Sequence, residues 1–187
     1  MSSTYHHGNL RRAVLDAAVA AIEESGPSGW SLRELARRAG VSHAAPAHHF
    51  GDKTGLLTAL AAEGFDLLTE ALTDSGGDLL DLGVAYVRFA AEHRAHFEVM
   101  FRPELYRGDD AELAAARTRT AAMLDRAVRA LSPDPDASLA AWSIAHGFAG
   151  LWLSGALPPG LGGDPSSAAR PVLAKLFAVR EDAPPGP

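Results

Sequence analysis

The sequence lacks the features that mark several other classes of protein. Its 187 residues include no cysteine, which excludes a disulfide framework and a thiolate metal site. It has no run of about 18 apolar residues, the length that a membrane-spanning helix needs. No apolar core of a secretory signal follows its N-terminal residues. We therefore predict a cytoplasmic protein that has no membrane partner.

Alternation of apolar and polar residues, the pattern of a half-buried strand, is also missing. Hydrophobic residues make up 47% of the chain, and many of them are alanine and leucine, which favour helices. The apolar spacing predicts an all-α fold of about nine helices. Two short helices lie within 31–50, a long one runs from 52 to just before Ser75, and the others lie at 9–25, 78–92, 93–101, 109–131, 136–155 and 165–180. Asn9 is expected to cap the first helix, and Pro171 to kink or shorten the last.

Residues 31–50 carry the most specific pattern. Ser31 can cap a helix, and Glu34 three residues later can complete a capping box. Gly40 can adopt the left-handed conformation that ends this helix, and Ser42 can cap the next one. Two short helices joined by such a tight turn are typical of a helix-turn-helix, whose second helix enters the major groove of DNA.

The charge is divided unevenly along the chain. The net charge is −6, but residues 1–53 hold six Lys or Arg against five acids, and the remainder holds eleven against eighteen. Five of the eight histidines also lie in the first segment. Because phosphate binding depends on the local charge of one surface, this division favours a DNA-binding head on an acidic body.

Segments on both sides of the helix-turn-helix strengthen this interpretation. Tyr5-His6-His7-Gly8-Asn9-Leu10-Arg11 precedes it, and His49-Phe50-Gly51-Asp52-Lys53, with Leu56-Leu57, follows its turn. Together with Ser31–Val41, these residues resemble the tetracycline-repressor-type (TetR/AcrR) family of bacterial regulators. Ala141–Gly147 is similar to the Trp…His-Gly element of one subgroup's ligand-binding domain.

The resemblance implies a homodimeric transcriptional repressor that binds a palindromic double-stranded DNA operator and is released by a small-molecule effector. It implies a DNA-binding domain over 1–55, a ligand-binding and dimerisation domain over 56–182, and a disordered tail over 183–187. The two heads would enter successive major grooves about 34–36 Å apart. It implies no enzymatic activity, cofactor or metal ion. The last two long helices are the expected dimer interface.

The resemblance also suggests which residues meet DNA. Arg33 and Lys53 are placed to contact phosphate, and the groove-facing candidates are Ser42, His43, Ala44, Ala47 and His48. The family carries a bulky apolar residue and a tyrosine where this chain has Pro46 and Ala47. Ala47 lacks the hydroxyl with which that tyrosine would bind phosphate, and Pro46 is expected to reset the first turn of the helix. The alternative is that His43 and His48 are only solvated.

A ligand pocket is expected to be mostly apolar with a few polar groups. The candidates for its lining are Tyr86, Phe89, Phe97, Phe101, Arg119, Met123 and His146. Each of them can equally belong to the packed core. His146 is either a hydrogen-bonded core histidine or a polar anchor for the ligand. Trp142 is expected to lie in the core or in the dimer interface.

A helical enzyme or metal-binding protein is the main alternative, with His93, His96 and His146 as its functional groups. His93 and His96 are three residues apart and could share a helix face as metal ligands. No nearby cysteine supports this, and the sequence contains no Glu-x-x-His pair, nucleophile elbow or phosphate loop. A third interpretation is a regulator whose body serves only to dimerise.

Overall fold

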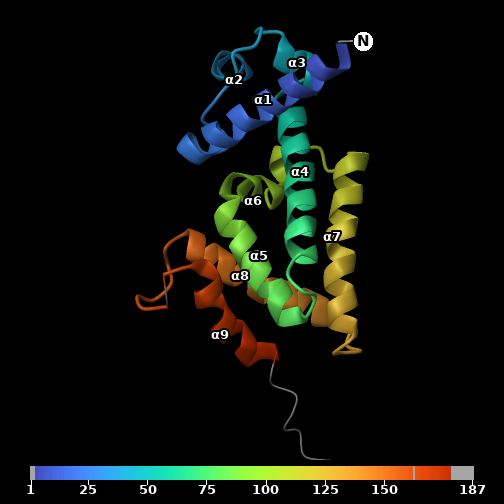
Figure 1. The fold of residues 1–187 in the computed structure, drawn as a ribbon, viewed down its shortest axis with the longest axis vertical. Helices are drawn as coiled ribbons and strands as arrows, with labels where there is room; N and C mark the ends of the chain where they lie inside the picture. Colours follow the sequence, from blue (N-terminus) through green and yellow to red (C-terminus); the bar gives the residue numbers. More distant parts are fainter. Residues whose placement is uncertain (1–2, 162, 178–187) are drawn as a thin grey trace, which may run out of the picture. The chain divides into compact units, whose positions relative to one another are not determined.

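The chain is helical throughout the part that the structure describes. The computed structural model describes residues 3–161 and 163–177, and within them it contains nine α-helices, one short 3-10 helix and no strand (Figure 1). The elements are α1 (Ser3–Ser25), α2 (Leu32–Arg38), α3 (Ala45–Phe50), α4 (Lys53–Thr73), α5 (Leu79–Glu92), α6 (Arg94–Met100), η1 (Pro103–Leu105), α7 (Ala111–Arg129), α8 (Ala137–Leu153) and α9 (Pro165–Phe177). The prediction of an all-α fold with about nine helices is confirmed. None of the described helices is both long and apolar enough to cross a bilayer.

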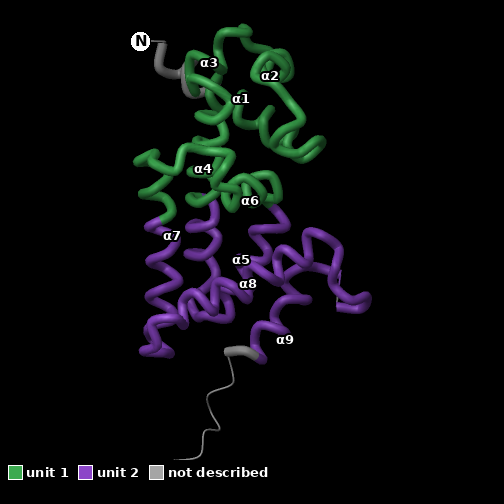
Figure 2. Tube along the Cα trace, turned by 180° about the vertical axis from the view of Figure 1, so that it is seen from behind, with its two compact units in different colours: residues 1–66, 93–117 green, residues 67–92, 118–187 purple. Residues whose placement is uncertain are grey.

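Packing divides the chain into two compact units (Figure 2). Unit 1 comprises Met1–Asp66 and His93–Arg117, and unit 2 comprises Leu67–Glu92 and Thr118–Pro187. The chain therefore passes from one unit to the other within α4, before α6 and within α7. The sequence predicts a boundary between a DNA-binding and a ligand-binding domain after residue 55. This boundary is defined by function and not by packing, and it stays a prediction.

Unit 1 is organised around α1, which packs against α2, α3 and α6. The apolar spacing of the sequence accounts for its core, whose fully buried side chains include Val14, Ala18, Leu35, Leu56 and Leu60. Burial of each such leucine contributes about 1.5–3 kcal/mol relative to exposure. Gly64 allows α4 to approach α6 closely, because a Cβ atom at this position would lie 2.5 Å from the sulfur of Met100.

Unit 2 is organised around α5, which packs against α8 and α9. Val87 and Phe89 of α5 and Leu173 of α9 are almost completely buried. A smaller cluster of Leu79, Val128 and Ala141 joins the start of α5 to the end of α7 and the start of α8. The helix α9 continues through Pro171.

Two expected helix starts are wrong. Helix α1 begins at Ser3, so Asn9 lies inside it and does not cap it. Helix α3 begins at Ala45 with Ala44 as its cap, so Ser42 does not cap it either. Proline has no N–H, and it is tolerated in the first turn of a helix because the N–H groups there lack intrahelical partners. Pro46 lies in that first turn and explains the late start. The expected end of the last helix at 180 and the tail 183–187 lie outside the described residues.

Candidate nucleic-acid interface

The first helix of the helix-turn-helix is capped at both ends as the sequence predicts. Ser31 Oγ accepts a hydrogen bond from the backbone N–H of Glu34 at 3.3 Å. Gly40 has a φ of +65°, a left-handed conformation that costs glycine little. The N–H of Val41 then donates to the carbonyl of Ala36 at 3.0 Å. These bonds fix the tight turn between α2 and α3.

The five groove-facing candidates are all exposed. Two belong to α3 and three to the turn before it, and they are Ser42, His43, Ala44, Ala47 and His48. Ala45, Pro46 and Phe50 of the same helix are buried. Because residues four apart lie on one face of a helix, burial of Pro46 and Phe50 turns Ala47 and His48 outward. The structure therefore places the candidates together on the exposed side of this short segment.

The side chain of Lys53 is held within unit 1. Its Nζ donates to the carbonyl oxygen of Trp30 at 2.8 Å and to that of Ser28 at 3.3 Å. The same ammonium lies 4.0 Å from the centre of the Trp30 ring, within cation–π range. Partial burial lowers the pKa of Lys53. Lys53 thus ties the start of α4 to the segment before α2, and its contact with phosphate stays a prediction.

Two arginines of the head are neutralised by nearby acids. Arg38 binds Glu24 and Glu34, each at 2.7 Å, so the Glu34 carboxylate completes an ion pair and not a capping box. Arg12 binds Asp16 and, at 2.9 Å, Glu63 of α4. These contacts leave little of either guanidinium charge for a phosphate.

Three other arginines remain available to DNA. Arg33, a predicted phosphate contact, and Arg37 are exposed and have no ion pair among the described residues. Arg11 is exposed and lies 5.6 Å from the centre of the Phe50 ring at the end of α3. The sequence did not single out Arg11 and Arg37. The sequence does contain a signal that could have found them. Arg12 and Arg38 each have an acidic residue four positions away in the same helix, whereas Arg11 and Arg37 have none.

A polar cluster in unit 2 contains one of the ligand candidates from α5 and one from α8. The Tyr86 hydroxyl lies 2.8 Å from His146 Nδ1 and accepts a hydrogen bond from Trp142 Nε1 at 3.3 Å. Burial raises the pKa of Tyr86, and burial lowers the pKa of His146. Nδ1 of a neutral His146 can therefore accept a hydrogen bond from the Tyr86 hydroxyl. This arrangement agrees with a hydrogen-bonded core histidine, and a role as ligand anchor stays a prediction.

The remaining ligand candidates are divided between the units. Phe97 and Phe101 belong to unit 1, where their ring centres lie 5.0 Å apart. Phe89, Arg119 and Met123 belong to unit 2. Phe89 is buried, whereas Arg119 is exposed. Their assignment to one ligand pocket stays a prediction.

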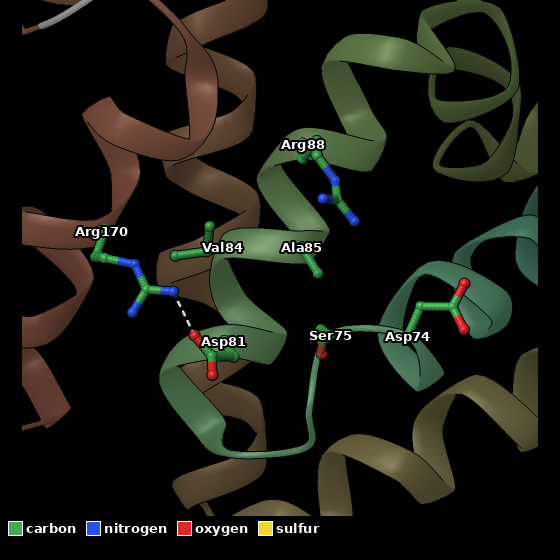
Figure 3. A pocket seen from close by; sticks show the side chains of 7 residues that line it. All are labelled: Asp74, Ser75, Asp81, Val84, Ala85, Arg88 and Arg170. Carbon is green, nitrogen blue, oxygen red and sulfur yellow. Dashed lines mark hydrogen bonds and ion pairs between the residues drawn. The ribbon is translucent and has the colours of Figure 1, made fainter.

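A hollow of about 200 Å³ opens on unit 2, and its lining is polar. It is lined by Asp74, Ser75, Asp81, Val84, Ala85, Arg88 and Arg170, and Arg170 forms an ion pair with Asp81 (Figure 3). None of the seven predicted ligand residues lines this hollow. Its four charged side chains differ from the mostly apolar lining that a small-molecule pocket has.

The histidines of the metal-binding alternative do not form a metal site. His96 is buried, and its Nε2 lies 3.0 Å from Oε1 of Glu63. His93 contacts the His96 ring edge to face, whereas His146 belongs to unit 2. Within the described part of the chain, no group of three His, Cys, Asp or Glu side chains could hold a metal ion.

The outer face of α8 is apolar. Leu139 and Leu151 are 59% and 48% exposed, which is unusual for large apolar side chains on one helix, whereas Trp142, which is 38% exposed, directs its Nε1 toward Tyr86. On the same helix, a Cβ atom added at Gly147 or Gly150 would meet nothing within 4 Å. This face can therefore receive another helix at close distance.

Comparison with known proteins gives matches over both halves of the chain. A family model described as "Bacterial regulatory proteins, tetR family" matches residues 14–60, and one described as "Tetracyclin repressor-like, C-terminal domain" matches residues 79–176. The HTH-type transcriptional regulator BetI of Stenotrophomonas maltophilia is 30% identical over 162 residues, which are 80% of this chain and 83% of BetI.

Solved structures share the fold. A protein of unknown function from Rhodococcus sp. RHA1 has a TM-score of 0.76 and 32% identity, covering 95% of this chain and 98% of its own. AibR, solved with isovaleryl coenzyme A and operator DNA, has a TM-score of 0.65 and covers 90% of this chain and 98% of its own. At 21% identity, AibR supports a common fold and nothing finer.

Proposed function

Because the chain belongs to the tetR family of bacterial regulatory proteins, we propose that it is a dimeric, ligand-responsive repressor of a palindromic operator. It is a transcriptional regulator and not an enzyme, since its family and its BetI relatives are transcriptional regulators. The enzyme alternative with His93, His96 and His146 is therefore not supported. We further propose that the protein acts in the cytoplasm, where its operator DNA lies.

The observation that carries the proposal is the exposed side of the turn and α3. Its imidazoles can donate to base or phosphate acceptors, and its alanines can contact a thymine methyl group. The short side chains of Ala44 and Ala47 allow the backbone of α3 to lie close to the bases. Arg11, Arg33 and Arg37 supply the uncompensated positive charge that phosphate contacts need.

Dimerisation is proposed through the apolar face of α8, together with α9. A pair of helices from each subunit would form a four-helix bundle. A second copy of the chain suits this face because symmetric regulators place two heads in successive major grooves. AibR, which shares this fold, was solved with isovaleryl coenzyme A and operator DNA, and we propose that a small molecule likewise binds the body of this chain.

Fluorescence anisotropy tests the proposal. Wild-type protein is titrated onto the DNA just upstream of its own gene and onto an unrelated duplex of equal length, over a range of salt. We expect a preference of about a thousandfold for the upstream DNA. The His43→Ala/His48→Ala variant should lose about tenfold or more of that affinity, because each base contact contributes about 1–3 kcal/mol.

His146→Ala is the matched control, since His146 lies in unit 2. Its affinity for the upstream DNA should stay within about twofold of wild type, a change of less than about 0.5 kcal/mol. Equal losses in the two variants would refute the assignment of DNA recognition to the turn and α3.

A further inference from the structure

The segment that follows α6 reaches the start of α4, next to the recognition helix. Arg107 Nη2 lies 2.7 Å from Oδ2 of Asp52, and the backbone N–H of Arg107 donates to Thr58 Oγ1 at 3.0 Å. The preceding Tyr106 is buried, and its hydroxyl donates to the Met100 carbonyl at 3.0 Å. All of these residues belong to unit 1 (Figure 2). Arg107 is therefore held in place by its neighbours and not only by its ion pair.

The chain at this point accommodates the arginine. A Cβ atom at Gly55 would lie 2.8 Å from Arg107 Nη1 and 2.0 Å from the carbonyl oxygen of Phe50. Any side chain at position 55 would therefore collide with the end of α3 or displace the guanidinium. The absence of a side chain lets α3, α4 and Arg107 meet closely.

Asp52 presents a negative charge where DNA is expected to lie. Its Oδ1 accepts the N–H of Gly55 at 2.8 Å and so caps α4. This hydrogen bond and the charge of Arg107 lower the pKa of Asp52, so the carboxylate is ionised at neutral pH. Asp52 is two residues beyond Phe50, the last residue of α3. An uncompensated carboxylate in this place would repel the phosphate backbone.

We propose that Arg107, which lies outside the helix-turn-helix, is a positioning residue for DNA binding because it neutralises Asp52 beside the recognition helix. The inference rests on the proposed function, since it needs α3 and the start of α4 to face DNA. It adds a residue of the segment 93–117 to the DNA-binding machinery. Any change that withdraws Arg107 uncovers the Asp52 carboxylate and weakens DNA binding.

The test compares four variants with wild type on a duplex of random sequence at low salt, read by fluorescence anisotropy. The effect is electrostatic and does not need the operator. Arg107→Ala should weaken binding about fivefold, the upper range for an exposed ion pair. Arg107→Lys should stay near wild type, because it keeps the charge. Asp52→Asn combined with Arg107→Ala should restore binding to within about twofold, since asparagine still accepts the Gly55 N–H but carries no charge.

Arg102→Ala is the matched control. Arg102 lies in the same segment, its side chain is 48% exposed against 47% for Arg107, and it pairs with Glu98 of its own helix region. The same charge is therefore removed at a similar exposure but away from Asp52, and binding should stay within about twofold of wild type. Thermal unfolding of all variants by circular dichroism checks that each one folds.

Two outcomes would overturn the inference while leaving the proposed function intact. One is wild-type affinity in Arg107→Ala. The other is a double variant as weak as Arg107→Ala, which would mean that Arg107 acts on DNA directly and not through Asp52. Failure of the wild-type protein to bind either the random duplex or its upstream DNA would overturn the proposed function, and this inference with it.

Discussion

The exposed side of the helix-turn-helix and the exposed side of α8 differ in chemistry. The first carries serine, histidine and alanine, bordered by arginines that have no acidic partner in the described part of the chain. The second carries Leu139 and Leu151 beside glycines. Polar donors and small side chains suit base edges and phosphates, whereas exposed large apolar side chains suit a second apolar surface. The contrast agrees with the two partners of the proposed function, DNA for one region and another copy of the chain for the other.

The strongest way to break this comparison is to place a charge on α8. Leu151→Glu would bury a carboxylate in the proposed interface, which costs several kcal/mol without a partner. We expect the protein to become monomeric in sedimentation equilibrium. Binding to the upstream DNA should fall by about a hundredfold or more, because two linked heads bind far more tightly than one.

The same substitution at Leu131 serves as the control for Leu151→Glu. Leu131 is 61% exposed but follows α7, outside the α8 face. Leu131→Glu should therefore remain dimeric and keep its DNA affinity. A Leu151→Glu variant that stays dimeric would show that the α8 face has another role.

A second prediction concerns the head and separates two roles of Lys53. Lys53→Ala removes two hydrogen bonds to carbonyl oxygens and the contact with the Trp30 ring. We expect the free energy of unfolding, measured in urea, to fall by about 1–2 kcal/mol. If the ammonium also contacts a phosphate, the affinity of the variant for DNA should fall equally for all sequences. The slope of the logarithm of the binding constant against the logarithm of the salt concentration, the salt slope, should then decrease in magnitude by about 1.

Lys175→Ala is the matched control, because Lys175 is the only other lysine of the chain and is exposed on α9. It should change neither stability nor salt slope. Loss of stability in Lys53→Ala with an unchanged salt slope would assign Lys53 a purely structural role. The start of α4 would then contact DNA through other groups.

The sequence predicts those parts of the site that depend on local spacing. Ser31 and Gly40 lie within one short segment, and the cap and the turn that they form follow from residue type alone, whereas the Glu34 carboxylate binds Arg38 instead of completing the predicted capping box. The late start of α3 was missed because a serine cap and a proline in the first turn compete, and the proline prevails. Local rules could not decide between them.

Contacts between distant parts of the chain were beyond prediction from the sequence. Lys53 meets Trp30 across 23 residues, and Arg107 meets Asp52 across 55. Such pairs depend on how helices pack, and helix spacing does not encode packing. The same reason explains why free and neutralised arginines could be separated only in part, since Arg12 is held both by Asp16 in its own helix and by Glu63 in α4.

The smallest expected effect concerns the inner side of α8, where His146 meets Tyr86. Burial places the pKa of His146 below its ordinary value of 6.5, so the unfolded chain binds the proton more readily than the folded chain does. The contribution of His146 to the free energy of unfolding therefore rises with pH between its folded and unfolded pKa values. It is fully present above about pH 6.5 and is lost as the pH falls toward the lower pKa of the folded state. Protonation would also turn Nδ1 from an acceptor of the Tyr86 hydroxyl into a donor.

His146→Gln tests this, because glutamine keeps an acceptor but does not titrate. We expect the free energy of unfolding in urea to differ less between pH 7.5 and 5.5, about one unit either side of 6.5, in this variant than in wild type. An equal pH dependence in both proteins would mean that water solvates His146. The inner side of α8 would then be open to water, unlike the outer face, which the proposed dimer would cover.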